Sequence, residues 1–304
     1  MKYQTTTLGK GERDCNERWS VIAPYLPKSG VVLDVGAAEG YFLNRIADDT
    51  DLLAVGVEKH KGRVENQKKL LAGKSGIICD FEINKSFTYK LTTTCEFFDS
   101  ILLLSALHWI NCDHVLRDLS MLAGTVFVEI PSIDDYSSTG QKFMQRVRAC
   151  GSEREYLEVI SQRHVKKIGE VKAHTSETRN LWLIHGPFSR TPSRPHIDYE
   201  KEKKQYLLKY INGQVEFYKK NEQKEWVNGV NFATLLAMNM VSPGYEWWER
   251  HIREVTDCLD QSKVKGDLRA HNLIITRERA YWIDLDHHAH KTTIFEDIKK
   301  CLKA

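Results

Sequence analysis

A regular alternation of short apolar runs and longer amphipathic segments, from residue 31 to residue 130, constrains the fold of this chain most strongly. The apolar runs have the length of strands, and we expect strands at Val31–Val35, Leu53–Glu58, Gly76–Cys79, Phe98–Leu104 and Thr125–Ile130. The segments that separate them predict helices at Gly40–Ala47, His60–Leu71 and His114–Ala123. Such alternation is typical of βαβ units around a parallel sheet, and it predicts an α/β fold.

After residue 130 the alternation of apolar runs and amphipathic segments stops, and the remaining elements complete a first domain. We expect a helix at Glu153–Arg163 and a final antiparallel pair of strands at Lys166–Val171 and Leu181–His185, so that the first domain covers residues 1–190. Prolines and charges without periodicity then indicate a linker at residues 191–203. We expect residues 204–304 to form a second, smaller domain. One hairpin is predicted at Gln205–Tyr210 with Gln214–Lys219 and another at Asn272–Ile275 with Ala280–Ile283. A helix is predicted between them, at Glu246–Leu259.

Composition limits the partners and the compartment. The 44 Lys and Arg against 41 Asp and Glu give a net charge of +3, too small a surplus to indicate a nucleic-acid partner from bulk charge. The seven cysteines lack the paired spacing of zinc ligands. No apolar run approaches the about 20 residues that a membrane helix needs. We therefore expect a cytoplasmic protein with free thiols and no membrane span, and these patterns indicate no oligomeric state.

The turn after the first predicted strand has the composition of a nucleotide-binding site. In the string DVGAAEGYF, which begins at Asp34, Gly36 and Gly40 let the backbone approach a ligand, and Ala38 lies between them. Asp34 and Glu39 would repel the phosphates that such turns commonly hold. The acidic turn instead favours a ligand with a cationic amino-acid end. S-adenosylmethionine, which carries an ammonium and a sulfonium, meets that requirement.

Two further acids end the next two predicted strands. Glu58 follows the second strand, where a carboxylate can accept hydrogen bonds from both ribose hydroxyls. Asp80 follows the third, where it could accept from an adenine amino group while Phe81 packs on the ring. A glycine turn alone is also typical of a plain strand–helix junction, and Asp80 alone could cap a helix. Three acids at successive strand ends favour the cofactor site.

Over about residues 13–185 the chain resembles the class I S-adenosylmethionine-dependent methyltransferases. Within that superfamily it is similar to the methyltransferase half of the bifunctional methyltransferase/kinases that terminate O-antigen polysaccharide chains. The likeness is carried by RDCNER from Arg13, the glycine turn, FDSILLLSALHW from Phe98, Val128-Glu129, IGE from Ile168 and HTS from His174. It implies a Rossmann-like sheet and methyl transfer to an oxygen, in that family on a phosphate that caps a glycan.

Methyl transfer from a sulfonium is an in-line displacement that needs alignment, a desolvated pocket and, for a hydroxyl acceptor, a base. His108 follows the fourth predicted strand and is the candidate base or orienting residue, and Ser105 before it is a candidate cofactor contact. Arg13, Arg18 and Arg179 could clamp an anionic acceptor. A polar loop histidine and structural ion pairs are the alternatives. We expect no metal in this domain.

The C-terminal sequence resembles the catalytic loop of aminoglycoside-phosphotransferase-like kinases. In KGDLRAHNLII followed by YWIDLD, Asp267 would be the base, while Asn272 and Asp284 would hold a metal ion. The domain is far shorter than a kinase and shows no glycine-rich phosphate loop ahead of this string. We interpret it as an α+β kinase remnant that has lost activity, with Mg-ATP binding as the alternative.

These observations predict a methyltransferase that modifies an oxygen of a phosphorylated or sugar acceptor, a small molecule or a glycan. Three alternatives stay open. The chain could keep both activities and methylate a phosphate that its kinase-like domain adds. It could methylate RNA, at a cap or a ribose, although its charge disfavours this. It could also be a noncatalytic partner that binds the cofactor without turnover.

Overall fold

The computed structural model of this chain describes residues 2–93, 96–110, 112–130, 138–173, 178–186, 206–211, 214–219, 229–241, 270–278 and 280–282. Its larger sheet has seven strands in the order β3-β2-β1-β4-β5-β7-β6. They are β1 (Ser29–Val35), β2 (Asp51–Glu58), β3 (Gly76–Asp80), β4 (Phe98–Leu103), β5 (Ala123–Glu129), β6 (His164–Lys172) and β7 (Thr178–His185). The neighbours from β3 to β5 pair in parallel, and β7 pairs antiparallel with both β5 and β6. The predicted parallel sheet with a final antiparallel pair is confirmed.

The strand order reverses between β1 and β4, and this reversal decides where a ligand can bind. The chain moves outward from β1 through β2 to β3, and then returns to the other side of β1 with β4 and β5. The connections at such a switch point leave the two strands in opposite directions, which opens a crevice at the carboxyl ends of the strands. The turn after β1 and the segment after β4 therefore face the same crevice.

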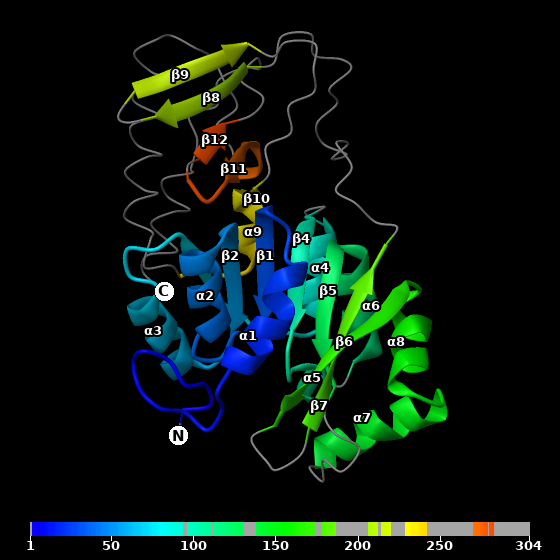
Figure 1. Ribbon diagram of the computed structural model, residues 1–304. Helices are drawn as coiled ribbons and strands as arrows, with labels where there is room; N and C mark the ends of the chain where they lie inside the picture. The colour runs from blue at the N-terminus through cyan, green and yellow to red at the C-terminus, as the bar shows by residue number, and fades with distance from the viewer. Residues whose placement is uncertain are drawn as a thin grey trace.

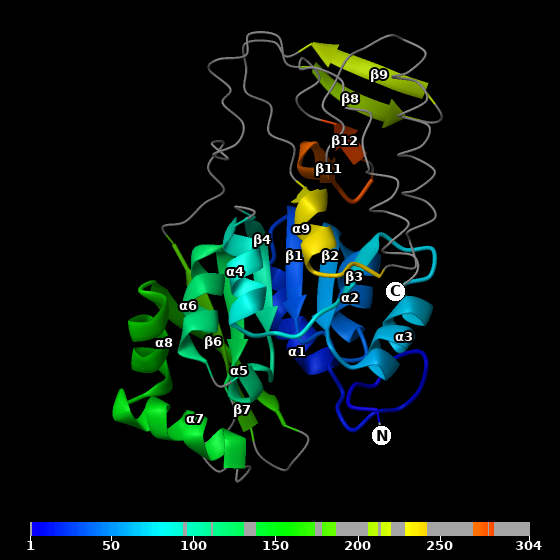
Figure 2. The same ribbon diagram turned by 180° about the vertical axis from the view of Figure 1, so that it is seen from behind.

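Helices cover both faces of the sheet (Figures 1 and 2). They are α1 (Asn16–Ile22), α2 (Tyr41–Asp49), α3 (Lys61–Leu70), α4 (Lys85–Thr93), α5 (Leu107–Ile110), α6 (Asp113–Met121), α7 (Ser138–Ala149) and α8 (Glu153–Ser161), with a short 3₁₀ turn, η1 (Ala23–Tyr25). The predicted helices are confirmed as α2, α3, α6 and α8. Within the described ranges, each helix is too short or too polar to traverse a bilayer.

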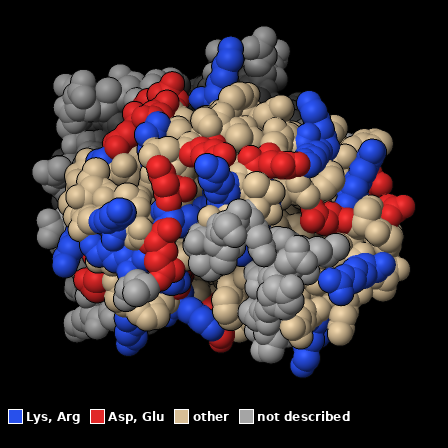
Figure 3. Space-filling view, turned by 60° about the horizontal axis from the view of Figure 1, so that its bottom comes forward, with Lys and Arg blue, Asp and Glu red and all other residues tan. Residues whose placement is uncertain are grey.

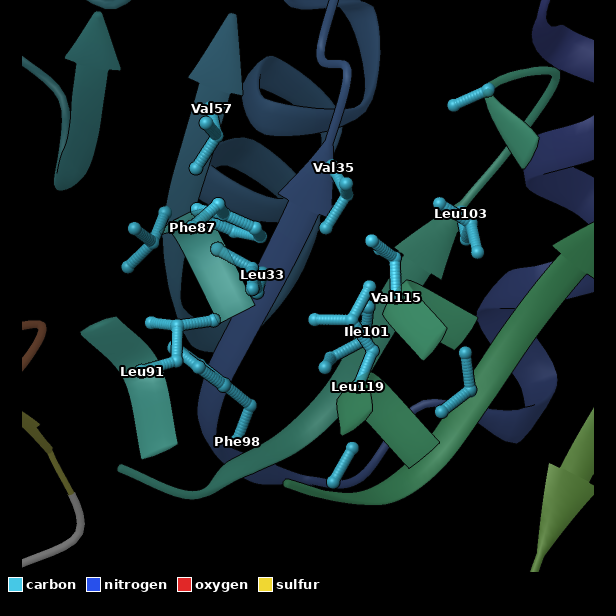
Figure 4. Close-up of a cluster of buried hydrophobic side chains, with 14 of the residues drawn as sticks. Leu33, Val35, Val57, Phe87, Leu91, Phe98, Ile101, Leu103, Val115 and Leu119 are labelled. Carbon is cyan, nitrogen blue, oxygen red and sulfur yellow. The ribbon is translucent and has the colours of Figure 1, made fainter. Parts of the chain in front are cut away.

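Two buried clusters fill the space between the sheet and these helices. Successive side chains of a strand point to opposite faces, so Leu33 of β1 joins the cluster under α4 and α6, whereas Val32 joins the one under α1 and α2. Figure 4 shows the first cluster, in which Phe87 and Leu91 of α4 lie against the strands. Our sequence prediction had no helix at α4, whose sequence KSFTYKLTT is rich in aromatic and β-branched residues. Burial of these two side chains overrides that weak helix propensity.

The C-terminal part contributes a second sheet of five strands, in the order β10-β11-β12-β8-β9. Its elements are β8 (Tyr206–Ile211), β9 (Gln214–Lys219), β10 (Val230–Asn231), α9 (Phe232–Ala237), η2 (Ala270–Asn272), β11 (Leu273–Ile275) and β12 (Ala280–Trp282). The two predicted hairpins are confirmed as β8–β9 and β11–β12. The predicted linker at 191–203 and the helix at 246–259 lie outside the described residues.

Residues 229–241 bind the second sheet to the first. Phe232 and Leu235 of α9 are buried in the same cluster as α4. The buried carboxylate of Glu96, just before β4, accepts hydrogen bonds from Asn231 N (2.9 Å) and Thr234 Oγ1 (2.8 Å). Glu96 precedes β4, so its contact with residues 231 and 234 lies at the amino ends of the parallel strands, opposite the crevice. The second sheet extends from this end of the first sheet (Figure 1).

We expect Glu96→Ala to lower the free energy of unfolding by about 2–4 kcal/mol, because two buried donors would lose their acceptor. Glu65→Ala is the control: Glu65 forms an exposed pair with Lys68 within α3, and its loss should cost less than about 0.5 kcal/mol. Urea denaturation of both variants measures the difference. Equal effects of the two substitutions would contradict a structural role for the Glu96 contacts.

Candidate functional site

A cavity of about 770 Å³ opens at the carboxyl ends of β1, β2 and β4. This volume is large enough for a nucleoside cofactor together with part of a second ligand. Its lining comes from six places in the sequence: Tyr3, Glu12, Gly36, Ala38, Glu58, Lys59, Arg63, Glu82, Ile83, Asn84, Leu104, Ser105, Ala106, His108, Trp109, Ile110 and Arg179. Of our predicted site residues, the cavity thus brings together Gly36, Ala38, Glu58, Ser105, His108 and Arg179.

The turn after β1 is a rigid cradle. Gly36, Ala38 and Gly40 all have positive φ angles, of 77°, 50° and 87°. A Cβ atom at Gly36 would lie 3.3 Å from the Cβ of Ala106, and one at Gly40 would lie 2.9 Å from Cγ of Gln67. Gly36 and Gly40 are therefore required by both backbone conformation and space. Gly40 itself is not in the described lining of the cavity, and its role is to begin α2.

The N-terminal residues close over this turn through Glu39. Its carboxylate accepts hydrogen bonds from Tyr3 N (2.9 Å) and Gln4 N (2.8 Å) and is 2% exposed. The Gln4 side chain in turn accepts from Tyr41 N (3.0 Å) at the start of α2. Glu39 is therefore satisfied by the backbone, and it brings Tyr3 to the cavity. No pattern in the sequence indicated Tyr3 or Glu12 as lining residues.

Glu58 ends β2 at the cavity wall. Its two oxygens accept from Ala38 N (3.0 Å) and His60 N (2.9 Å), and Arg63 Nη1 lies 3.9 Å away. The carboxylate is almost fully buried, and it is fixed next to the glycine turn. Each oxygen keeps a further lone pair, so Glu58 can still accept hydrogen bonds from a ligand hydroxyl.

Asp34 belongs to β1 and lies outside the described lining of the cavity. It is 2% exposed, and its Oδ2 atom has no hydrogen-bond partner. Burial, and after it the charge of Glu58, raises the pKa of Asp34 from 3.8 to about 8. The carboxyl group is therefore largely protonated at neutral pH unless a cation enters the site.

The raised pKa of Asp34 predicts a pH-dependent effect of Asp34→Asn. A carboxyl group whose pKa is higher in the folded than in the unfolded chain stabilises the folded state. This stabilisation is complete below pH 3.8 and is lost as the pH rises through about 8. The Asn side chain does not titrate, so the variant lacks this pH-dependent contribution. The free energy of unfolding of Asp34→Asn should therefore rise relative to wild type between about pH 5 and about pH 8.5. Denaturant titrations at both pH values measure this, and a difference that does not change with pH would contradict it.

Three arginines surround one buried carboxylate beside the cavity. Arg13 Nη2 lies 2.5 Å and Arg179 Nη1 3.6 Å from Glu129 Oε1, and Arg18 Nε lies 2.8 Å from Glu129 Oε2. None of these four side chains is more than 5% exposed. Among the described residues, three guanidinium groups thus contact one carboxylate in a region shielded from water. Arginines gathered in this way are suited to bind an anion.

Ser105 connects this arginine cluster to the cavity. Its Oγ atom accepts from Arg13 Nη1 (2.7 Å) and Arg179 Nη1 (3.1 Å), and its backbone has a positive φ of 54°. Ser105 and Arg179 line the cavity, whereas the predicted catalytic residues Arg13 and Arg18 do not. Arg13 and Arg18 act behind the wall, where they hold Ser105 and Glu129. Of the three clustered arginines, Arg179 is the one that lines the cavity.

His108 and Trp109 form the opposite side of this end of the cavity. Both belong to α5, directly after β4, and their rings lie 5.2 Å apart. His108 is 3% exposed, whereas Trp109 is 65% exposed. Both residues line the cavity, His108 with a buried side chain and Trp109 with an exposed one.

Asp80 and Phe81 are at the predicted place in the chain but outside the described lining of the cavity. Phe81 packs towards Phe87, with ring centroids 6.2 Å apart, and Lys90 Nζ lies 4.3 Å from the centre of its ring. The residues directly after them, Glu82, Ile83 and Asn84, form the wall instead. Asp80 and Phe81, the predicted adenine contacts, therefore lie beside the cavity wall and do not form it.

The kinase-like residues are only partly described. Asn272 ends η2 and is 5% exposed, while Asp267 and Asp284 lie outside the described residues, as does the string from His174 to Ser176. Of the described residues beyond 203, none lines the cavity. Figure 3 shows the face at the bottom of Figure 1, where acidic and basic side chains alternate over the described surface. That face is not uniformly basic.

No protein-family model matches this chain, and no curated protein matches its sequence. Among solved structures, it is similar to the bifunctional kinase-methyltransferase WbdD, with a TM-score of 0.51 and 17% identity over 93% of this chain and 79% of that chain. A complex of WbdD with the kinase inhibitor LY294002 gives 0.50 and 16% over the same shares. Magnesium protoporphyrin IX methyltransferase (ChlM) from Synechocystis PCC 6803 gives 0.41 and 10% over 56% of this chain and 77% of that chain. The likeness to WbdD confirms the predicted fold resemblance and the Rossmann-like methyltransferase sheet.

Proposed function

We propose that this chain is an S-adenosylmethionine-dependent methyltransferase that modifies an oxygen of an anionic acceptor, a phosphorylated or sugar-containing small molecule or glycan. The observation that carries the proposal is the polarity of the cavity. The carboxylate of Glu58 lies at the cavity wall beside the glycine turn, with the Asp34 carboxyl group buried behind it, and the three buried arginines that contact Glu129 lie around Ser105. A cationic cofactor and an anionic acceptor would meet between them.

The acidic end suits the cofactor. The glycine turn lets a ligand approach the backbone, and Glu58 has lone pairs free for ribose hydroxyls. The protonated, unpartnered Asp34 would ionise when the ammonium or sulfonium of the cofactor enters, because a nearby positive charge lowers the pKa of a carboxyl group. A phosphate ligand would gain no such interaction here.

The other end suits the acceptor and the transfer. Arg179 can bind an anionic oxygen, because a guanidinium donates two parallel hydrogen bonds to a phosphate or carboxylate. In the reaction an acceptor oxygen forms a bond to the methyl carbon while the carbon–sulfur bond breaks and sulfur keeps the electron pair. A phosphate oxygen needs no base, and His108 would take the proton from a hydroxyl acceptor. The second sheet is proposed as an inactive kinase-like scaffold.

Calorimetric titration with S-adenosylmethionine tests the cofactor. Wild type should bind, and Glu58→Gln should weaken binding by about 10- to 100-fold, because a charged acceptor of ligand hydrogen bonds is lost. Glu65→Gln, on the exposed face of α3, should leave the affinity unchanged. If wild type shows no binding, or if Glu58→Gln binds as wild type does, the proposed cofactor site is wrong.

Arg179→Gln tests the acceptor. With labelled S-adenosylmethionine and a set of sugar phosphates and matching unphosphorylated sugars, we expect wild type to methylate phosphorylated acceptors in preference. Arg179→Gln should raise the acceptor KM by about 10-fold or more while the cofactor affinity stays within about twofold, since Arg13 still donates to Ser105 Oγ when the bond from Arg179 is lost. Cofactor binding without turnover on any acceptor would favour the noncatalytic alternative. Turnover on RNA, reduced by added salt, would favour the RNA alternative.

A further inference from the structure

A segment from the C-terminal part of the chain lies along β3, at the point where the cavity wall begins. Val241 N donates to Ile78 O (2.6 Å), and Cys79 and Met240 form an antiparallel bridge. Asp80 N then donates to Asn239 O (3.0 Å). Residues 239–241 therefore extend the sheet at the carboxyl end of β3.

Asn239 holds Asp80 from two sides. Its carbonyl accepts from Asp80 N, and its side-chain Nδ2 donates to Asp80 O (3.1 Å). Its φ of 54° is a left-handed conformation that few residues other than Gly, Asn and Asp adopt readily. Backbone and side chain thus both bond to the backbone of one residue, and the side-chain bond requires the amide group.

Asp80 is the last residue of β3, and Glu82, Ile83 and Asn84 follow it as cavity lining. The wall faces the glycine turn, because a Cβ atom at Gly36 would lie 3.8 Å from Cδ1 of Ile83. At its far end, Asn84 Oδ1 accepts from Ser86 N (2.8 Å) and begins α4. The position of the wall therefore depends on where β3 stops.

The same C-terminal segment also restrains the wall from behind. Lys90 Nζ donates to Ala237 O (2.9 Å) at the end of α9, and it lies over the ring of Phe81. Phe81 directly precedes the lining residues. The residues from 80 to 84 are thus held between Asn239 on one side and Lys90 with Ala237 on the other.

We propose that Asn239 is a positioning residue for the adenosine part of the cofactor. It touches no reacting atom; it fixes the backbone of Asp80 and thereby the wall at residues 82–84. The inference rests on the proposed function, since it requires that the cavity bind S-adenosylmethionine. It also gives the C-terminal part of the chain a role in the cofactor site, although the described residues of that part do not line the cavity.

Two variants separate the side-chain bond from the backbone conformation. Asn239→Asp keeps the size and the left-handed preference but replaces the donor to Asp80 O with an acceptor. Asn239→Gly adopts the positive φ without strain and simply lacks the side chain. Asn44→Asp makes the same chemical change at a half-buried position of α2, outside the cavity, and is the matched control.

The measurement is the dissociation constant of S-adenosylhomocysteine and of adenosine, by calorimetry, at a temperature where each variant is folded. We expect Asn239→Asp and Asn239→Gly to weaken both ligands by the same factor, about 5- to 10-fold, because adenosine contains the part that meets the wall. Asn44→Asp should match wild type. A purely structural role would lower the melting temperature and leave both constants unchanged.

The outcomes distinguish the two proposals. If wild type binds both ligands and the two Asn239 variants bind them equally well, the positioning role is wrong and the methyltransferase proposal stands. If the variants lose affinity for S-adenosylhomocysteine but not for adenosine, Asn239 does not act on the adenosine wall and the inference is also overturned. If wild type binds neither ligand, the proposed function fails, and the inference fails with it.

Discussion

The buried carboxylate of Glu129 is the interaction on which the site most depends. It lies at the end of β5 and pairs with arginines from the N-terminal segment and from β7, so one acidic side chain joins parts of the chain that are more than a hundred residues apart. Without it, three buried guanidinium groups would lose the carboxylate that they share in a region of low dielectric. The cluster also holds Ser105, and through it the start of the segment that carries His108.

The cavity is asymmetric in charge because of where these groups lie on the sheet. Acids gather at the ends of β1 and β2, on one side of the switch point, and the arginine cluster gathers near the ends of β5 and β7 on the other. The reversal of strand order between β1 and β4 places the two groups on opposite sides of one crevice.

Local features of this site could be predicted from the sequence, whereas contacts between distant segments could not. The glycine turn and Glu58 are fixed by a strand, a tight turn and a spacing within one βα unit, and the structure places them in the cavity. The adenine contacts were expected at Asp80 and Phe81, but packing of Phe81 onto α4 places the following residues in the wall. Tyr3 and Asn239 reach the site through hydrogen bonds to remote residues, and no periodicity or motif records such bonds.

The bridge between residues 239–241 and β3 has a consequence for self-association. An open sheet exposes unpaired backbone groups along its outer strands, where another chain can add as a further strand and begin aggregation. Here the carboxyl half of β3 is already paired by Asn239 and Val241. The opposite outer strand, β6, carries Lys166, Lys167, Glu170 and Lys172, and charged side chains of this kind disfavour such addition. Both edges of the larger sheet are thus protected, one by the chain's own C-terminal segment and the other by charge.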